Sequence, residues 1–276
     1  EGNEFTVLGL TAVSGPVTVG NVNQHTVTLV DQDFAQIAFG NGASSVTEGD
    51  AAQTIQVLLL TNGATIASGV SVDLTLSGSA VNPDDYTLSS QTASFAANSG
   101  DNTPFNITLT TIDDNSVEAV EQATLTLDPG TVTGVATVGN PNAHTVTFND
   151  NDFATAVYTA AASSVNEGAS GSITVQLQTN GATLGLPITV ELPISGSAQR
   201  GPDYNFSAPL NGTPLRVTFN VNEVDPTRTL TLNAVDDTLI EGNEQGVFDL
   251  TTVSGPVTVG NVNQHTVTLV DQDFAQ

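Results

Sequence analysis

The chain repeats itself, and this limits its fold more than any other feature. Residues 1–36 and 241–276 are identical at 31 of 36 positions. A more diverged copy lies halfway along the chain, where His144–Asp152 corresponds to His25–Asp33 and to His265–Asp273. These copies are 119 and 121 residues apart, so the repeating unit is a domain of about 120 residues.

Further matched segments fix the phase of the repeat. Thr61–Thr65 recurs as Thr179–Thr183, with the same Thr-Asn-Gly-Ala-Thr sequence. We therefore expect the C-terminal strands of a preceding repeat at residues 1–33, a first full domain at 34–152 and a second at 153–276. The chain lacks Met and begins and ends at different phases of the repeat, as a window on a longer array would.

Each repeat is predicted to be all-β. Several short segments rich in Val, Ile, Leu and Thr alternate with a period of two residues, which is typical of strands. The strands predicted in the first repeat are Ile55–Leu60, Val70–Leu76, Phe105–Thr110, Ala123–Leu127 and His144–Phe148. Asn-Gly pairs at 41–42, 62–63, 180–181 and 211–212 predict turns, and those bounded by strands are candidate β-hairpins. Together these signals indicate tandem immunoglobulin-like Greek-key β-sandwiches.

The charge balance excludes several classes of function. The chain has 29 acidic residues, three Arg and no Lys, so its formal net charge is −26. Such a polyanion cannot neutralise a run of phosphates, which excludes nucleic acid as a partner. The absence of Cys excludes disulfides and thiolate metal sites, and no apolar run is long enough for membrane insertion. Carboxylate chemistry remains, and carboxylates suit hard cations.

Most of the acids fall into four clusters that recur from repeat to repeat, and 20 of the 29 stand at such positions. In the first repeat they are Glu48, Asp85, Asp113, Asp114, Glu118, Glu121, Asp150 and Asp152. In the second they are Glu167, Asp203, Asp236, Asp237, Glu241, Glu244, Asp271 and Asp273. The leading fragment contributes Glu1, Glu4, Asp31 and Asp33.

Calcium is the cation that these clusters favour. Like charges brought together raise one another's pKa and oppose the compact state, and a bound cation offsets that cost. Ca²⁺ takes six to eight oxygen ligands from flexible loops, whereas Mg²⁺ keeps more water. Zn²⁺ would require His or Cys, and the one His of each unit stands at a strand start, away from the acids in sequence. A solvated acidic surface is the alternative.

Four motifs in order at matching spacing, twice, resemble the Calx-beta domain. They are Val-x-Glu-Gly at residues 46–49, Gly-Ser-Ala followed by Asp-Tyr, Asp-Asp-x(3)-Glu-x(2)-Glu, and the closing Asp-x-Asp. The resemblance covers essentially the whole chain. It implies an immunoglobulin-like sandwich of the kind found in sodium–calcium exchangers and in large extracellular bacterial adhesins. It also implies that the acids named above bind Ca²⁺ in loops at one end of each sandwich.

The expected function is structural. We expect a repeat segment of a calcium-stiffened filament or adhesin stalk, extracellular and at the cell surface, whose partners are neighbouring repeats and which self-assembles into fibres. The alternative is a calcium-sensing regulatory module acting on a partner protein. An enzyme is not expected, because a carboxylate pair such as Asp113-Asp114 lacks the sugar-stacking aromatics that a glycosidase needs.

Three further expectations concern individual residues. His25, His144 and His265 are expected to support the last strand rather than bind metal, and Tyr86 and Tyr204 are expected in the core. Phe5–Leu10 and Thr26–Val30 are predicted as the last two strands of a sandwich. Because two strands cannot bury a core, the other strands come from upstream in the same chain or, by strand addition, from another chain.

Overall fold

The computed structural model describes residues 2–11, 14–207 and 214–273. Its described elements are the strands β1 to β26 and one short 3-10 turn at Pro129–Thr131, which confirms the all-β prediction. The chain divides into two compact units. The first comprises Glu1–Ile112 and Glu121–Phe148, and the second comprises Asp113–Val120 and Asn149–Gln276. Among the described residues, no helix has the length and apolar character needed to span a membrane.

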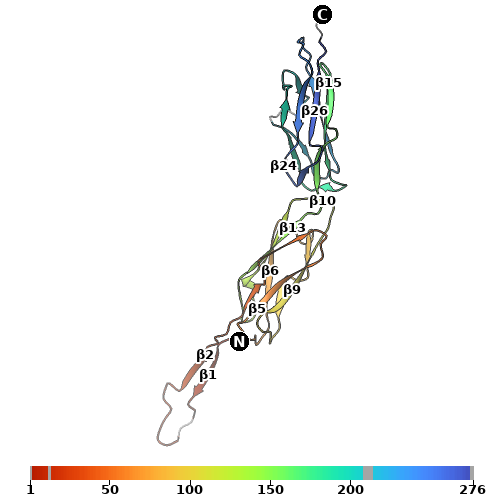
Figure 1. The fold of residues 1–276 in the computed structure, drawn as a ribbon. Coiled ribbons are helices and arrows are strands. Elements are labelled where there is room, and N and C mark those ends of the chain that lie inside the picture. The colour runs from red at the N-terminus through yellow and green to blue at the C-terminus, as the bar shows by residue number, and fades with distance from the viewer. Residues whose placement is uncertain (1, 12–13, 208–213, 274–276) are drawn as a thin grey trace. The chain divides into compact units, whose positions relative to one another are not determined.

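The first unit contains two five-stranded sheets with the orders β4-β13-β11-β6-β8 and β12-β3-β5-β9-β7. Figure 1 labels β6 and β13 of the first sheet and β5 and β9 of the second. The strands of the first sheet are β4 (Ala43–Thr47), β13 (Ala143–Asn149), β11 (Glu121–Leu127), β6 (Val70–Gly78) and β8 (Thr92–Phe95). Those of the second are β12 (Thr137–Val138), β3 (Gln36–Phe39), β5 (Gln53–Leu60), β9 (Thr103–Thr111) and β7 (Tyr86–Leu88). All five strands predicted for this repeat are confirmed.

Alternation along the strands builds the core. In β5, Ile55, Val57 and Leu59 are buried while the intervening side chains are more exposed. A fully buried aliphatic side chain contributes about 1.5–3 kcal/mol relative to an exposed one. Tyr86 stacks on Phe148 with ring centroids 5.2 Å apart, which confirms the core position predicted for this tyrosine.

The second unit repeats this arrangement with one interruption. Its four-stranded sheet is β15 (Ala162–Asn166), β26 (Gln264–Val270), β23 (Glu244–Asp249) and β19 (Ile194–Gly196). Its five-stranded sheet is β20 (Tyr204–Phe206), β22 (Thr227–Ala234), β16 (Ser170–Gln178), β14 (Ala154–Tyr158) and β25 (Val257–Val259). A three-stranded sheet is β21 (Leu215–Phe219), β18 (Ile188–Leu192) and β24 (Thr251–Ser254).

The interruption has a local cause. β18 and β19 together occupy the place of β6, and Pro193 stands between them. Proline has no backbone N–H to donate to a sheet ladder. A strand that is continuous in the first repeat is therefore divided between two sheets in the second.

A short parallel pair completes the second unit. β10 (Ser116–Val117) pairs with β17 (Thr183–Leu184), with Ser116 opposite Thr183 and Val117 opposite Leu184. β10 lies in the loop between β9 and β11, so a segment of the first repeat belongs to the second unit.

The leading fragment forms an antiparallel hairpin. β1 (Glu4–Gly9) pairs with β2 (Gln24–Leu29) in the register that the matching strands β23 and β26 adopt, Glu4 facing Leu29 as Glu244 faces Leu269. The two predicted strands are confirmed. Phe5 is 72% exposed and Leu29 is 58% exposed, whereas Leu269 at the matching position of β26 is 4% exposed.

The Asn-Gly pairs at 62–63 and 180–181 were predicted correctly as turns and wrongly as hairpins. Asn62 and Gly63 have positive φ angles of 52° and 92°, and Asn180 and Gly181 have 53° and 93°, so both pairs make the predicted tight turns. The hairpin assignment was wrong, because β5 and β6, which flank the first turn, lie in different sheets. The pair at 211–212 lies outside the described residues.

Candidate metal centres

The closing Asp-x-Asp is a recurring turn. In each copy the backbone N–H of the second Asp donates to Oδ1 of the first. The distances are 3.0 Å for Asp33 and Asp31, 2.7 Å for Asp152 and Asp150, and 2.8 Å for Asp273 and Asp271. This is the local turn that Asp side chains form with the backbone two residues ahead, so the spacing has a conformational cause.

A second set of hydrogen bonds ties this turn to the loop before the last two strands. Oδ2 of Asp271 accepts from the N–H of Glu241 and of Gly242, both at 2.9 Å. Oδ2 of Asp150 accepts from the N–H of Glu118 at 2.5 Å, which is the matching bond in the first repeat. The N–H of Gly242, followed by those of Asp273 and Glu241, lowers the pKa of Asp271, so this carboxylate stays ionised.

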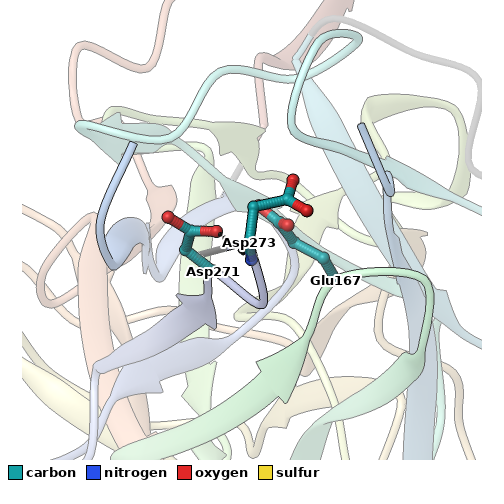
Figure 2. Close-up of side chains that lie close together, drawn as sticks. All are labelled: Glu167, Asp271 and Asp273. Atoms are coloured by element: carbon teal, nitrogen blue, oxygen red, sulfur yellow. Dashed lines mark hydrogen bonds between the residues drawn. The ribbon is translucent and has the colours of Figure 1, made fainter. Parts of the chain in front are cut away.

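Glu167, Asp271 and Asp273 form the first group of converging carboxylates (Figure 2). All three are half-buried, and each offers an oxygen within 4.8 Å of the others. Oε2 of Glu167 and Oδ2 of Asp273 are buried and accept no hydrogen bond from any described residue. Burial, followed by the charges of Asp271, Asp237 and Asp273, raises the pKa of Glu167, and a hydrogen bond from the backbone of Gln272 offsets only part of this effect. The charged form loses water and lies near like charges.

Asp203, Glu241 and Glu244 form the second group, again with oxygens within 4.8 Å of one another. Loss of hydration, followed by a hydrogen bond with Asp203, raises the pKa of Glu244. Loss of hydration, followed by the charge of Asp237, raises the pKa of Glu241. Oδ2 of Asp203 accepts from the N–H of Gln199 at 2.5 Å.

The remaining acids of the second repeat border these groups. Asp237 is exposed, and its Oδ1 accepts from the N–H of Leu239 at 2.7 Å. Asp236 lies against Gly168, whose φ is +71° and whose missing Cβ would stand 3.4 Å from the Cβ of Asp236. Six of the eight predicted residues thus form two groups, and Asp236 and Asp237 stand outside both.

The predicted acids of the first repeat are divided between the two units. Asp113, Asp114, Glu118, Asp150 and Asp152 belong to the second unit, whereas Glu48, Asp85 and Glu121 belong to the first. No three of them come within 4.8 Å among the residues that the structure describes.

Asp152 is a first-repeat acid whose pKa is raised. It is half-buried, and its Oδ2 is buried without a hydrogen-bond donor among the described residues. Burial, followed by the charges of Asp150, Asp114 and Asp113, raises its pKa. Asp113 accepts from Nδ2 of Asn151 at 2.6 Å. Sequence reasoning missed this amide, and its place inside the closing Asp-x-Asp was the available signal.

In the first unit, Glu48, Asp85 and Glu121 are all half-buried. Oδ2 of Asp85 accepts from the N–H of Val81 at 2.5 Å, as Asp203 does from Gln199. The Asp before each Tyr therefore closes a turn with one oxygen. In the leading fragment Glu4 and Asp33 are exposed and Asp31 is half-buried, while Glu1 lies outside the described residues.

The two described buried histidines are structural, as predicted. Nδ1 of His144 lies 2.9 Å from the carbonyl of Asn41 and Nε2 lies 2.8 Å from Oγ of Ser44. His265 repeats this with Ala160 and Ser163, at 2.6 Å and 2.9 Å. A carbonyl only accepts, so Nδ1 of both histidines carries a proton. Nε2 of His265 accepts from Ser163, whereas the hydroxyl of Ser44 donates to Oε1 of Gln53 at 2.9 Å.

A β-sandwich whose end loops gather half-buried carboxylates has the architecture of a cation-binding module. The Calx-beta domain model matches residues 31–152 and 156–273, and the chain belongs to this family. No curated protein matches this sequence.

The chain is also similar to several solved structures. CBD12 from CALX1.2 is 15% identical, with 84% of this chain and 98% of that chain covered and a TM-score of 0.38. The calcium binding domain CBD12 of CALX1.1 is also 15% identical, covering 84% and 99% with a TM-score of 0.38. The apo-form Calx CBD1 domain is 21% identical, covering 43% and 99% with a TM-score of 0.37.

Proposed function

We propose that this chain binds Ca²⁺ through the end-loop carboxylates of its Calx-beta domains and is a calcium-stiffened structural segment of an extracellular filament or adhesin stalk at the cell surface. One observation carries the calcium proposal. Glu167, Asp271 and Asp273 converge within 4.8 Å, and two of their oxygens are buried without a donor among the described residues.

The donor set fits a hard cation. All of its members are carboxylates, the ligands that Ca²⁺ prefers, and both described buried histidines are engaged elsewhere. Two of the three arginines pair with acids outside the groups, Arg216 with Glu191 at 2.9 Å and Arg228 with Glu223 at 2.6 Å. Bound Ca²⁺ would supply the positive charge that offsets the repulsion within the groups.

The residues of this chain would convert such binding into stiffness through short connections. Asp152 is followed two residues later by Ala154, the first residue of β14. Asp271 directly follows β26, and it accepts a hydrogen bond from the loop that precedes β23. Fixing these carboxylates would therefore fix both the start and the end of the second sandwich. Without disulfides, a metal is an available means of stabilising small sandwiches.

The proposed partners are neighbouring repeats of the same protein and copies assembled into fibres, with no role for nucleic acid, membrane insertion or catalysis. The alternative is a calcium-sensing module that regulates a partner protein. The midpoint calcium concentration separates the two, because extracellular modules bind in the range of about 10⁻⁴–10⁻³ M and sensors at about 10⁻⁷–10⁻⁵ M.

The test is thermal unfolding of the purified chain in CaCl₂, in MgCl₂ and in excess EGTA at fixed ionic strength. We expect a higher Tm in calcium than in EGTA, with little change in magnesium. A titration of Tm against free calcium then gives the midpoint. The same Tm in all three conditions would mean that the acids form a solvated surface, and the calcium proposal would fail.

A further inference from the structure

Three polar side chains occupy inward-facing positions of the first sandwich. Ser44 lies two residues before the buried Val46 in β4, and Gln53 lies two residues before the buried Ile55 in β5. Because side chains alternate between the two faces of a strand, both belong to the face that packs on the core. His144 lies on the inner face of β13 and is 1% exposed. Buried polar groups need hydrogen-bond partners, and these three meet one another.

Ser44 stands between the other two residues. Its Oγ lies 2.9 Å from Oε1 of Gln53 and 2.8 Å from Nε2 of His144. Nδ1 of His144 lies 2.9 Å from the carbonyl oxygen of Asn41, so in the neutral ring Nε2 carries the lone pair. The ring also lies against Phe39, with ring centroids 5.7 Å apart. The arrangement is a hydroxyl with a base on one side and a carboxamide on the other.

A serine hydroxyl beside an imidazole is the arrangement that activates a nucleophile. The hydroxyl carries one proton, and rotation about the Cβ–Oγ bond turns this proton from Oε1 of Gln53 to Nε2 of His144. Cδ of Gln53 is bonded to Oε1, so the electrophilic carbon lies one bond beyond an atom that already contacts Oγ of Ser44. The fold holds nucleophile, base and electrophile together, which lowers the barrier to a reaction between them.

The second repeat has the hydroxyl and the base but lacks the carboxamide. Oγ of Ser163 lies 2.9 Å from Nε2 of His265, as in the first repeat. By the register of each strand with its neighbour, Gly171 occupies the position in β16 that Gln53 occupies in β5. The serine–histidine pair is thus common to both repeats and supports the last strand, whereas the glutamine is an addition in the first.

We propose that Ser44 and Gln53 form an ester cross-link autocatalytically, with His144 as the general base. Oγ of Ser44 attacks Cδ of Gln53 while its proton passes to Nε2 of His144. The tetrahedral intermediate then collapses, and the bond between Cδ and Nε2 of Gln53 breaks. The leaving nitrogen takes the proton from His144 and departs as ammonia. The product is an ester between Oγ and Cδ, and the reaction needs no further reactant.

This bond joins the two sheets of the first sandwich. Ser44 belongs to the sheet that contains β4 and β13, and Gln53 belongs to the sheet that contains β5. The chain contains neither Cys nor Lys, so neither a disulfide nor a lysine amide can join these sheets. An ester needs only the hydroxyl, carboxamide and imidazole that meet here. The inference concerns the first unit alone and does not depend on the calcium proposal.

The first test is the intact mass of the purified full chain. The wild type is expected to be lighter than its sequence requires by one ammonia, because ester formation releases that molecule. Ser44→Ala lacks the nucleophile and Gln53→Glu lacks the leaving ammonia, so neither should show this loss. Ser163→Ala is the matched control and should retain the loss, because it removes the equivalent serine where glycine replaces the glutamine.

The second test locates the bond. Glu48 lies between Ser44 and Gln53, so a protease that cuts after glutamate places the two residues in different peptides. In the wild type these peptides should stay joined until mild alkali hydrolyses the ester, which leaves glutamate at position 53. Ser44→Ala should give two separate peptides with glutamine at position 53.

The third test concerns the base. His144→Phe keeps an aromatic ring beside Phe39 but has no lone pair for the serine proton. It should slow formation of the joined form by about a hundredfold or more, measured as the joined fraction against time after synthesis. His265→Phe, the same change in the second repeat, should leave this rate unchanged.

A triad that only forms hydrogen bonds gives a different result. Wild-type chains with the full sequence mass, separate peptides and glutamine at position 53 would overturn the proposal. An ammonia loss that persists in Ser44→Ala would also overturn it, because another amide would then be the source. An unchanged circular dichroism spectrum shows that Ser44→Ala is folded, and the nearly isosteric Gln53→Glu is the second variant. The chain mass is independent of any response to calcium, so the two proposals fail separately.

Discussion

The carboxylates of Glu167 and Asp273 lie within 4.8 Å of each other, and each buries one oxygen that no described residue hydrogen-bonds. Glu167 comes from the turn after β15, and Asp273 follows β26, the strand that pairs with β15. Because these strands are parallel, their C-terminal ends, and with them both acids, lie at the same end of the sheet. Burying two ionised carboxylates there costs free energy of folding. The stability of the fold therefore depends on whether a proton, a cation or a substitution neutralises one of these charges.

Glu167→Gln should therefore stabilise the metal-free chain and weaken the binding of calcium. In EGTA the variant loses a partly buried charge whose pKa is raised, so its Tm should rise. In calcium it loses an anionic ligand, so calcium affinity should fall by about tenfold or more. Calorimetric titration and thermal unfolding measure the two effects.

The control is Glu191→Gln, which removes an acid paired with Arg216 outside the carboxylate groups. It should leave calcium affinity unchanged. If both variants bind calcium as the wild type does, Glu167 is no ligand.

The pH dependence of the metal-free chain follows from the same groups. The pKa values of Glu167, Glu244 and Asp152 are raised in the folded state. At a pH between the pKa values of the unfolded chain and the higher values of the folded chain, the folded chain therefore binds more protons than the unfolded chain. Stability must then fall as pH rises through the raised values. In EGTA, we expect a lower Tm at about pH 7 than at about pH 5.

Calcium should remove or reverse this trend, because the ion competes with protons for the same oxygens. Asp271 acts in a separate range: its pKa is lowered, so its contribution is present above the ordinary Asp value and is lost only at lower pH. A Tm in EGTA that climbs steadily from about pH 5 to about pH 7 would contradict this account of the carboxylate groups.

Local signals in the sequence were sufficient to predict the five longest strands of the first repeat, β5, β6, β9, β11 and β13. β5 and β13 alternate apolar and polar residues, and the duplicated segment fixes where a repeat ends. The division of one strand at Pro193 was not predicted, although a proline that interrupts a sheet ladder was the available signal. The Asn62-Gly63 turn was predicted, but the sheets that it connects were not, because turn chemistry is local and sheet membership depends on which faces pack together.

The acid positions were predicted better than their grouping. Repetition identified Glu167, Asp271 and Asp273. The division of the first repeat's acids between two units depends on the tertiary path of the loop at residues 113–120. Val117 itself reads as an incidental residue in an acidic loop. Its burial depends on β17, more than 60 residues away in the sequence, and single-sequence patterns carry no information about such contacts.

The buried serine–histidine pair predicts a stability effect. Ser163→Ala would leave Nε2 of His265 buried without its 2.9 Å donor, at a cost of about 1–3 kcal/mol. Ser164→Ala, at the exposed neighbouring position, should change stability by less than about 0.5 kcal/mol. Urea unfolding of the full chain followed by tyrosine fluorescence reports on the second unit through Tyr158 and Tyr204. Equal shifts for both variants would show that the hydrogen bond adds nothing to stability.

The Gly-Ser-Ala motif predicts a larger effect of a different origin. Gly196 has a φ of +108°, and a Cβ there would overlap the carbonyl oxygen of Gln245 on the neighbouring strand β23. Ser197 and Ala198 complete the contact, since Oγ of Ser197 accepts from the N–H of Gln245 at 2.9 Å and the N–H of Ala198 donates to its carbonyl at 3.0 Å. The motif thus needs glycine because two backbones approach closely.

Gly196→Ala should destabilise the second unit by at least about 3 kcal/mol, since backbone overlap adds to the strain of positive φ. Gly201→Ala isolates the strain alone, because Gly201 has a φ of +109° with nothing within 4 Å of the added Cβ, and should cost about 1–2 kcal/mol. Urea unfolding in calcium and in EGTA measures both. If the two variants lose the same stability, the close approach of Gly196 to Gln245 is not what the motif preserves.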